Sequence, residues 1–242
     1  MNLTMKVLSC SPRVYEIKDF LSKIEVDHIM KLATGMTLHT STTKAGVDGE
    51  AREDKTTRTS KNTWVHREKS PIIDIIYRRA ADLLQVDESL MRVRHANERP
   101  DFPFRSSMAE QLQLVHYDVG QQCELGLNDS LALLVLLKTL TSFVLLDTPH
   151  HDFAVPTLAE GQPMRYATIL FYLNEGMGAG ETAFPRWHNA DTGEQLMVTP
   201  ETGKAVLFYS LLPDGNMDER SQHAAQPVTG GEKWLTNLWC KY

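Results

Sequence analysis

The sequence predicts an all-β core with flanking helices, in the form of a β-sandwich or barrel. From about Glu110 onward, short runs of β-branched and aromatic residues alternate with Gly, Pro and Asp, as strands and turns do. The two clear helical patterns both precede this region, so helices do not separate the predicted strands. The chain has 242 residues, 42% of them hydrophobic, which suits one domain over residues 1–242 with a sizeable core.

The first predicted helix covers residues 22–35. Ser22 and Glu25 form a capping box at its start, and Gly35 stands where a left-handed C-terminal cap is expected. The residues that follow, 36–63, are polar and rich in Thr and charge, and they predict a loop. We expect this helix to pack against the core.

The second predicted helix lies within residues 70–84. Ser70 can cap it, and Pro71 fits the first helical position. Its apolar residues recur at helical spacing, namely Ile72, Ile73, Ile76, Ala80, Leu83 and Leu84. This periodicity predicts a second helix that packs on the core.

Four runs downstream predict the main strands: QLQLVHYDV, RYATILFYL, AVLFYSLL and KWLTNLWC. Residues 131–146 do not follow this pattern, because they form an apolar run broken only by Lys138 and hydroxyl residues. A buried helix or a strand pair explains the run, whereas a membrane span needs roughly 20 apolar residues. We therefore expect no transmembrane segment in this chain.

Composition and charge narrow the possible partners. The formal net charge is −6, with Lys and Arg scattered along the chain, which argues against nucleic acid and leaves small molecules and peptides. Cys10, Cys123 and Cys240 lie far apart without a CxxC spacing, so neither a disulfide framework nor a zinc cluster is expected. The amino end shows no signal-peptide pattern, so nothing in it indicates secretion.

The segment TPHHDF carries the first chemical signal. His150 and Asp152 are two residues apart, so on an extended strand their side chains project to one face while His151 points to the other. A third ligand from another strand would complete a 2-His-1-carboxylate facial triad, which binds iron(II) and leaves positions open for a co-substrate and dioxygen. His223, which follows the apolar run AVLFYSLL, is the best candidate.

A second signal follows His223. Pro227 and the pair Gly230-Gly231 predict a turn, so that Lys233 returns on the next strand, where its amine can meet a dicarboxylate bound at the metal. Taken alone, an HxD triplet is common by chance, and a lone histidine is more often a surface residue than a ligand. A zinc hydrolase is a further alternative, but the sequence lacks an HExxH helix and that reading leaves Lys233 unexplained.

These residues stand within a longer set of motifs: RTSKNTW, EQLQLVHYDVGQQ, PHHDF, RYATILFYL, AGETAFP, KAVLFYSLLPDGNMDERSQHAAQPV and GEKWLTNLW. With these motifs the chain resembles the prolyl 4-hydroxylase family of 2-oxoglutarate- and Fe(II)-dependent dioxygenases, most closely the plant and algal type. The resemblance runs from Ser11 nearly to the carboxyl end.

The resemblance implies a double-stranded β-helix, or jelly roll, with the iron site in the barrel mouth. It places His150, Asp152 and His223 at the metal-binding, catalytic positions. It further implies cofactor-binding roles for Lys233, Tyr117 and Thr168, and substrate-binding roles for Arg58, Ser60, Glu110, Arg165 and Trp239. The plainer reading of the aromatic residues is core packing, and that of the charged ones is a solvated surface.

The implied reaction is the hydroxylation of peptidyl proline to 4-hydroxyproline, coupled to conversion of 2-oxoglutarate and O2 into succinate and CO2. The substrate partner is then a proline-containing peptide or protein. Ascorbate is expected to restore oxidised iron, and family members imply the endoplasmic reticulum or secretory pathway as the compartment.

The chain departs from the family pattern between GQQ and TPHHDF. Residues 123–147, which number 147 − 123 + 1 = 25, replace a short link that carries one tyrosine, and Asp147 stands in the position of that tyrosine. The segment is either a real hairpin insertion or translated intron sequence, and its exposed apolar character favours the intron. Gln226 and Lys241 also differ from common family residues. The alternative function is a catalytically silent metal- or peptide-binding homologue, disabled by the 123–147 insertion.

Overall fold

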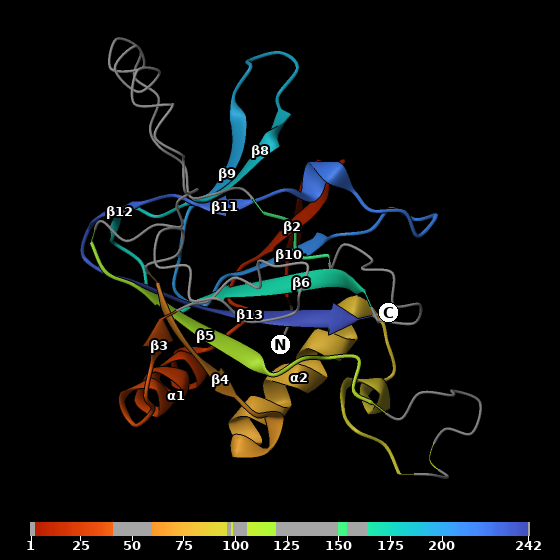
Figure 1. Cartoon of the computed structure of the whole chain (residues 1–242), viewed down its shortest axis with the longest axis vertical. Coiled ribbons are helices and arrows are strands. Elements are labelled where there is room, and N and C mark those ends of the chain that lie inside the picture. The colour runs from red at the N-terminus through yellow and green to blue at the C-terminus, as the bar shows by residue number, and fades with distance from the viewer. Residues whose placement is uncertain are drawn as a thin grey trace, which may run out of the picture.

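The computed structural model describes residues 3–40, 60–95, 98, 106–119, 150–153 and 164–241 (Figure 1). Within these residues an antiparallel sheet has the strand order β1-β2-β10-β6-β13-β5-β4-β3. Its strands are β1 (Met5–Cys10), β2 (Arg13–Ile17), β10 (Ala205–Tyr209), β6 (Arg165–Tyr172), β13 (Lys233–Lys241), β5 (Leu112–Tyr117), β4 (Lys61–Val65) and β3 (His39–Thr40). The predicted all-β core is thus confirmed.

Two smaller sheets lie on one side of the main sheet, and the helices lie on the other (Figure 1). In one of them β8 (Thr182–His188) lies between β11 (Ala224–Ala225) and β9 (Gln195–Val198), and in the other β12 (Val228–Gly230) pairs with β7 (Gly178–Ala179). Short 3-10 turns, η1 (Arg67–Lys69), η2 (Glu88–Met91) and η4 (Glu219–Ser221), connect the larger elements.

Helix α1 (Lys23–Thr34) begins at the predicted capping box. The Glu25 carboxylate accepts a hydrogen bond from the Ser22 backbone N–H at 2.7 Å, and Ser22 Oγ accepts one from the Glu25 N–H at 3.4 Å. The same carboxylate pairs with Arg79 of α2 at 2.7 Å. The left-handed cap at Gly35 was wrong, because Gly35 has φ −96° and the helix ends without a left-handed residue.

Helix α2 (Pro71–Leu84) is confirmed with its predicted cap, since Ser70 Oγ accepts a hydrogen bond from the Ile73 N–H at 3.3 Å. Its fully buried face consists of Ile73, Ile76, Tyr77, Ala80 and Ala81. Three predicted core positions, Ile72, Leu83 and Leu84, are only half-buried. The buried face packs on the sheet.

Strand β13 separates two cores by alternation, because successive side chains of a strand point to opposite faces. Leu238 and Cys240 belong to the core shared with the two helices. Leu235 belongs to a second core, which it forms with Val115, Leu170 and Tyr172 of the main sheet and with Phe184, Leu196 and Val198 of β8 and β9. The main sheet is therefore buried on both faces.

The four predicted strands are present as β5, β6, β10 and β13. The loop predicted over residues 36–63 was wrong at its ends, where β3 and β4 pair with each other. Residues 41–59, and also 123–147 with the apolar run 131–146, lie outside the described residues. Among the described residues, no helix combines the length and the apolar character that crossing a membrane requires.

Candidate metal centre and its surroundings

Two histidines far apart in the sequence are held together by their own backbones. His150 N–H donates to the His223 carbonyl at 2.9 Å, and His223 N–H donates to the His150 carbonyl at 3.0 Å. Their ring centroids are 4.4 Å apart. The expected extended strand over residues 150–152 was wrong, because a single bridge at His150 is followed by a bend. The bend nevertheless turns Asp152 toward both imidazoles.

The three predicted ligands meet at one point. Asp152 Oδ1 lies 3.8 Å from His150 Nε2, and Asp152 Oδ2 lies 3.6 Å from His223 Nε2. One donor atom of each residue lies within 4.8 Å of the other two, a spacing at which they could hold a metal ion. The ring of His151 points away, toward the Glu219 carbonyl, to which its Nε2–H can donate at 3.1 Å. As predicted, His151 points away from the site that His150 and Asp152 share.

Neighbouring groups fix the orientation of two of these side chains. Thr168 Oγ1 donates to Asp152 Oδ2 at 2.7 Å. His223 Nδ1 lies 3.0 Å from the Ser221 carbonyl, so a proton on Nδ1 leaves the lone pair of Nε2 directed at the centre. Such outer contacts set the tautomer and the ring orientation of metal-binding histidines.

The carboxyl group of Asp152 is held ionised. Burial by itself raises its pKa, but the adjacent imidazoles of His223 and His150 and the hydrogen bond from Thr168 outweigh this and lower the pKa to about 2. Asp152 and His223 have side chains only 5% and 8% exposed, whereas His150 is 34% exposed. The centre therefore opens to solvent on the side of His150.

Lys233 lies at the start of β13, paired in register with Tyr117 of β5. Gly231 has φ +76°, a conformation that favours glycine and forms the predicted turn before it. The Lys233 side chain is fully buried, and its Nζ lies 5.6 Å from the Tyr117 ring centroid and 5.7 Å from that of Tyr172. Because an ammonium is costly to bury, a carboxylate ligand beside it would be held strongly.

Three of the predicted substrate-binding residues form one cluster. Arg165 donates to both carboxylate oxygens of Glu110, at 2.7 and 2.9 Å, and its guanidinium lies 3.7 Å from the Trp239 ring centroid. Lys241 adds a second positive charge at 3.3 Å from Glu110. These side chains engage one another rather than standing as separate solvated charges.

The other predicted residues have different surroundings. Thr168 is buried and hydrogen-bonded to Asp152. Ser60 is buried just before β4. Arg58 lies outside the described residues. The sequence analysis missed the Ser221 carbonyl and the backbone bridge between the histidines, because neither leaves a side-chain signal.

A second group of possible ligands lies at the carboxyl end of β5, beside Tyr117 and Lys233. It consists of His116, Asp118 and Glu232. His116 Nε2 is 2.8 Å from Glu232 and 3.6 Å from Asp118, and its ring stacks on Trp234. Both acids are about half exposed, and Asp118 also pairs with Lys61. Ordinary surface ion pairs account for this group.

Comparison with known proteins agrees with this geometry. Residues 147–241 match the sequence profile of the 2OG-Fe(II) oxygenase superfamily. The chain is 29% identical over 249 residues to "Probable prolyl 4-hydroxylase 3" of Arabidopsis thaliana, covering 97% of this chain and 71% of that protein. It is 29% identical over 244 residues to "Probable prolyl 4-hydroxylase 6" of the same plant, covering 96% and 70%. Over nearly its whole length, the chain is therefore similar to prolyl 4-hydroxylases.

The match to prolyl 4-hydroxylases extends to animals and to solved structures. The chain is 30% identical over 241 residues to prolyl 4-hydroxylase subunit alpha-1 of Gallus gallus, of which it spans 35%. Its fold is similar to the viral collagen prolyl hydroxylase of Paramecium Bursaria Chlorella virus-1, crystallised as a 2OG complex, with a TM-score of 0.59 and 21% identity over 94% of this chain and 95% of that one. The predicted jelly roll is confirmed, and the matches to prolyl 4-hydroxylases indicate that the chain is an oxidoreductase.

Proposed function

We propose that the protein is a 2-oxoglutarate- and Fe(II)-dependent dioxygenase that hydroxylates peptidyl proline to 4-hydroxyproline, with release of succinate and CO2. The observation that carries the proposal is the meeting of His150, Asp152 and His223 at one point. The relatives named as prolyl 4-hydroxylases support the choice of substrate class.

The donor set suits Fe(II). Two imidazoles and one carboxylate are the ligands of the facial triad of non-haem iron oxygenases, in which the remaining positions stay open. His150 Nε2, His223 Nε2 and an Asp152 oxygen would hold the metal. Bound iron would supply the oxidative chemistry, in which one oxygen atom of O2 enters succinate and the other enters the new hydroxyl group of proline.

Lys233 and Tyr117 would hold 2-oxoglutarate. The buried Lys233 ammonium would pair with the distal carboxylate, which leaves the keto acid end for the metal. The role of Thr168 suggested by its hydrogen bond is to orient Asp152, because its hydroxyl proton already goes to that carboxylate. Ascorbate dependence and a location in the endoplasmic reticulum remain predictions.

The cluster of Glu110, Arg165 and Trp239 would form one wall of the peptide site. The Arg165 guanidinium lies over the Trp239 ring and is held by both oxygens of Glu110, so the wall is fixed before the peptide arrives. A fixed wall lowers the entropy cost of binding.

The test is peptide-dependent turnover. The full chain, and the chain with residues 123–147 deleted, should convert 2-oxoglutarate to succinate only with Fe(II) and a proline-rich peptide, with equimolar 4-hydroxyproline detected by mass spectrometry. His223→Ala should lose iron and turnover while it stays folded. His188→Ala is the matched control, since His188 is exposed on β8.

Absence of 4-hydroxyproline with both collagen-like and plant-type hydroxyproline-rich peptides would overturn the prolyl assignment. Stoichiometric iron binding without any succinate formation would favour the silent homologue instead.

A further inference from the structure

The side chain of Asn174 is bonded to the backbone on both sides of Lys233. Its Nδ2–H donates to the Glu232 carbonyl at 2.8 Å, and its Oδ1 accepts from the Trp234 N–H at 2.7 Å. Because a carbonyl can only accept and an N–H can only donate, both bonds are made in one orientation of the amide. Asn174 thus clamps the two residues that flank Lys233.

This clamp lies where one neighbour of β13 runs out. Strand β6 ends at Tyr172, opposite Leu235, so the start of β13 at Lys233 extends past it. The Asn174 side chain forms hydrogen bonds there of the kind that a longer β6 would form. On its other edge β13 pairs with β5, where Lys233 lies opposite Tyr117. The start of β13 is therefore held from both sides.

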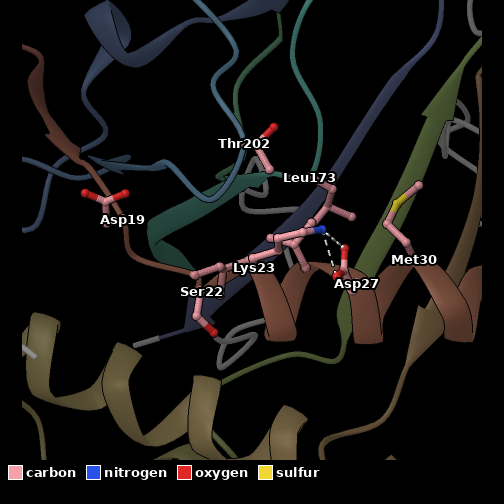
Figure 2. A pocket seen from close by; sticks show the side chains of 9 residues that line it. Asp19, Ser22, Lys23, Asp27, Met30, Leu173 and Thr202 are labelled. Atoms are coloured by element: carbon pink, nitrogen blue, oxygen red, sulfur yellow. Dashed lines mark hydrogen bonds and ion pairs between the residues drawn. The ribbon is translucent and has the colours of Figure 1, made fainter.

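The segment that carries Asn174 is itself anchored. The Leu173 N–H donates to the Trp234 carbonyl at 3.0 Å, and the Glu175 carboxylate accepts a hydrogen bond from the Thr202 N–H at 2.8 Å. Figure 2 shows Leu173 and Thr202, which both line a cavity at the start of α1. Since both neighbours of Asn174 are fixed, its amide has a firm base from which to hold β13.

The stem of the Lys233 side chain is closely enclosed. The side chain is fully buried, and its Nζ lies 5.6 and 5.7 Å from the ring centroids of Tyr117 and Tyr172. Gly180 adjoins the stem so closely that a methyl group at that position would lie 3.5 Å from Lys233 Cδ. Because the stem has little room, the position of the ammonium follows the position of the Lys233 backbone.

A fixed ammonium has a consequence for the choice of keto acid. In the proposed function a dicarboxylate is held at two ends, by the metal at the keto acid end and by Lys233 at the other. One CH2 group more or less typically changes the selectivity of a binding site by 10- to 200-fold. A site can use this difference only if its two ends keep a constant separation.

We propose that Asn174 is a positioning residue that makes the co-substrate site selective for the length of the keto acid. The site then prefers 2-oxoglutarate to 2-oxoadipate, which is longer by one CH2 group. Asn174 acts through the peptide groups on either side of Lys233 and not by contact with the keto acid. The proposal rests on the role of Lys233 in the proposed function.

Competitive binding provides the test. The full chain is loaded with Ni(II) in place of Fe(II), so that no turnover occurs, and equilibrium dialysis with radiolabelled 2-oxoglutarate gives its Kd. Competition by unlabelled 2-oxoadipate gives the second Kd. The wild-type protein should bind 2-oxoglutarate at least tenfold more tightly. Asn174→Ala should raise the Kd of 2-oxoglutarate by about tenfold and change that of 2-oxoadipate little, so that the ratio approaches one.

Three further variants separate positioning from general damage. Asn216→Ala is the matched control, because Asn216 bonds only to Asp214 of its own turn among the described residues, and both Kd values should stay unchanged. Ile76→Ala removes a fully buried side chain from the helix-covered face, so it should lose stability and keep the ratio. Asn174→Asp keeps the acceptor but loses the donor, and it should shift the ratio in the same direction as Asn174→Ala.

The outcomes distinguish this proposal from the proposed function. A ratio that is already near one in the wild type, or that both Asn174 variants leave unchanged, overturns the proposal, as does an equal loss of ratio in Ile76→Ala. Binding in this assay needs neither a peptide nor turnover. A protein that binds 2-oxoglutarate selectively but forms no 4-hydroxyproline would therefore refute the hydroxylase and leave the role of Asn174 standing. If the wild type binds neither keto acid, this proposal falls together with the role of Lys233.

Discussion

The two faces of the main sheet are built from the same strands but differ in what they bury. The face under α1 and α2 holds a continuous apolar core, with Phe20, Ile76 and Phe171 among its buried members. The opposite face is apolar beneath β8 and β9, but toward the metal centre it buries Asp152, Thr168 and Lys233. One face therefore supplies stability, and the other buries polar groups at a cost that ligands would offset.

Because of this difference, some substitutions should change only the stability of the protein and others only its binding of metal or co-substrate. A change on the helix-covered face is expected to alter the free energy of unfolding and to leave metal affinity alone. A change among the residues around the metal centre, on the opposite face, is expected to alter metal or co-substrate affinity. The same substitution can be made at a matched position elsewhere in the chain, which gives each prediction an internal control.

The largest effect is expected at Asp152. Asp152→Asn keeps the shape but removes the charge, so iron affinity should fall by more than the 10- to 100-fold typical of outer-shell residues. Asp74→Asn makes the same change in α2, where Asp74 pairs with Arg67 and Arg78, and it should alter stability alone. Iron titration measures the affinity of both variants, and thermal unfolding measures their stability. Equal iron affinity in the two variants would contradict the assignment of the ligand.

The helix-covered face should respond most at Ile76, which is fully buried. Ile76→Ala leaves a cavity and is expected to lower the free energy of unfolding by about 2–5 kcal/mol. Ile75→Ala, one residue away and 48% exposed, should change it by less than about 0.5 kcal/mol. Urea denaturation gives both values, and the folded fraction of each variant should bind iron as the wild type does. A weaker iron affinity in Ile76→Ala would show that the two faces are not separable.

Lys233→Met tests the co-substrate position. Removing one partner of a buried charge pair costs several kcal/mol, so the KM for 2-oxoglutarate should rise by about 100-fold while iron affinity is unchanged. Lys204→Met is the comparison, because Lys204 is also buried but pairs with Glu16 and Glu201. That variant should lose stability and keep its KM. An unchanged KM in Lys233→Met would remove Lys233 from the site.

The smallest effect is expected from losing one hydroxyl. Thr168→Val removes the hydrogen bond to Asp152 and should weaken iron binding by about tenfold. Thr236→Val makes the same change on the helix-covered face, where Thr236 Oγ1 has no hydrogen-bond partner among the described residues, so it should be neutral or slightly stabilising. Competition with a metal indicator resolves a tenfold difference. If the two variants bind iron equally, Thr168 does not position Asp152.

Sequence patterns were sufficient where one local rule decides the structure. The capping box of α1 and the Ser-Pro start of α2 are local, and the long strands β6 and β13 are rich in β-branched and aromatic residues. Strand β8 was missed because it contains Pro185, which sits where the pairing with β9 shifts register. Strands β1 and β2 were also missed, although they are as long as the predicted strands β5 and β10.

The ligands could be named from spacing and motif, but their arrangement could not. The sequence indicated His150, Asp152 and His223 as one set. It did not indicate that a bend rather than a strand carries Asp152, nor that Trp64 contacts Trp239, because both depend on pairing between distant segments.

The mutual backbone hydrogen bonds of His150 and His223 bear on how the length of the chain before His150 can change during evolution. Because each histidine is positioned by the other, the distance between the two ligands does not depend on how many codons lie upstream of His150. For a flexible loop, each doubling of length costs only about 0.6 kcal/mol of closure entropy. Selection can thus act on the length of the stretch before residue 150 and on the metal chemistry independently, whether residues 123–147 were gained as an insertion or are read through from an intron.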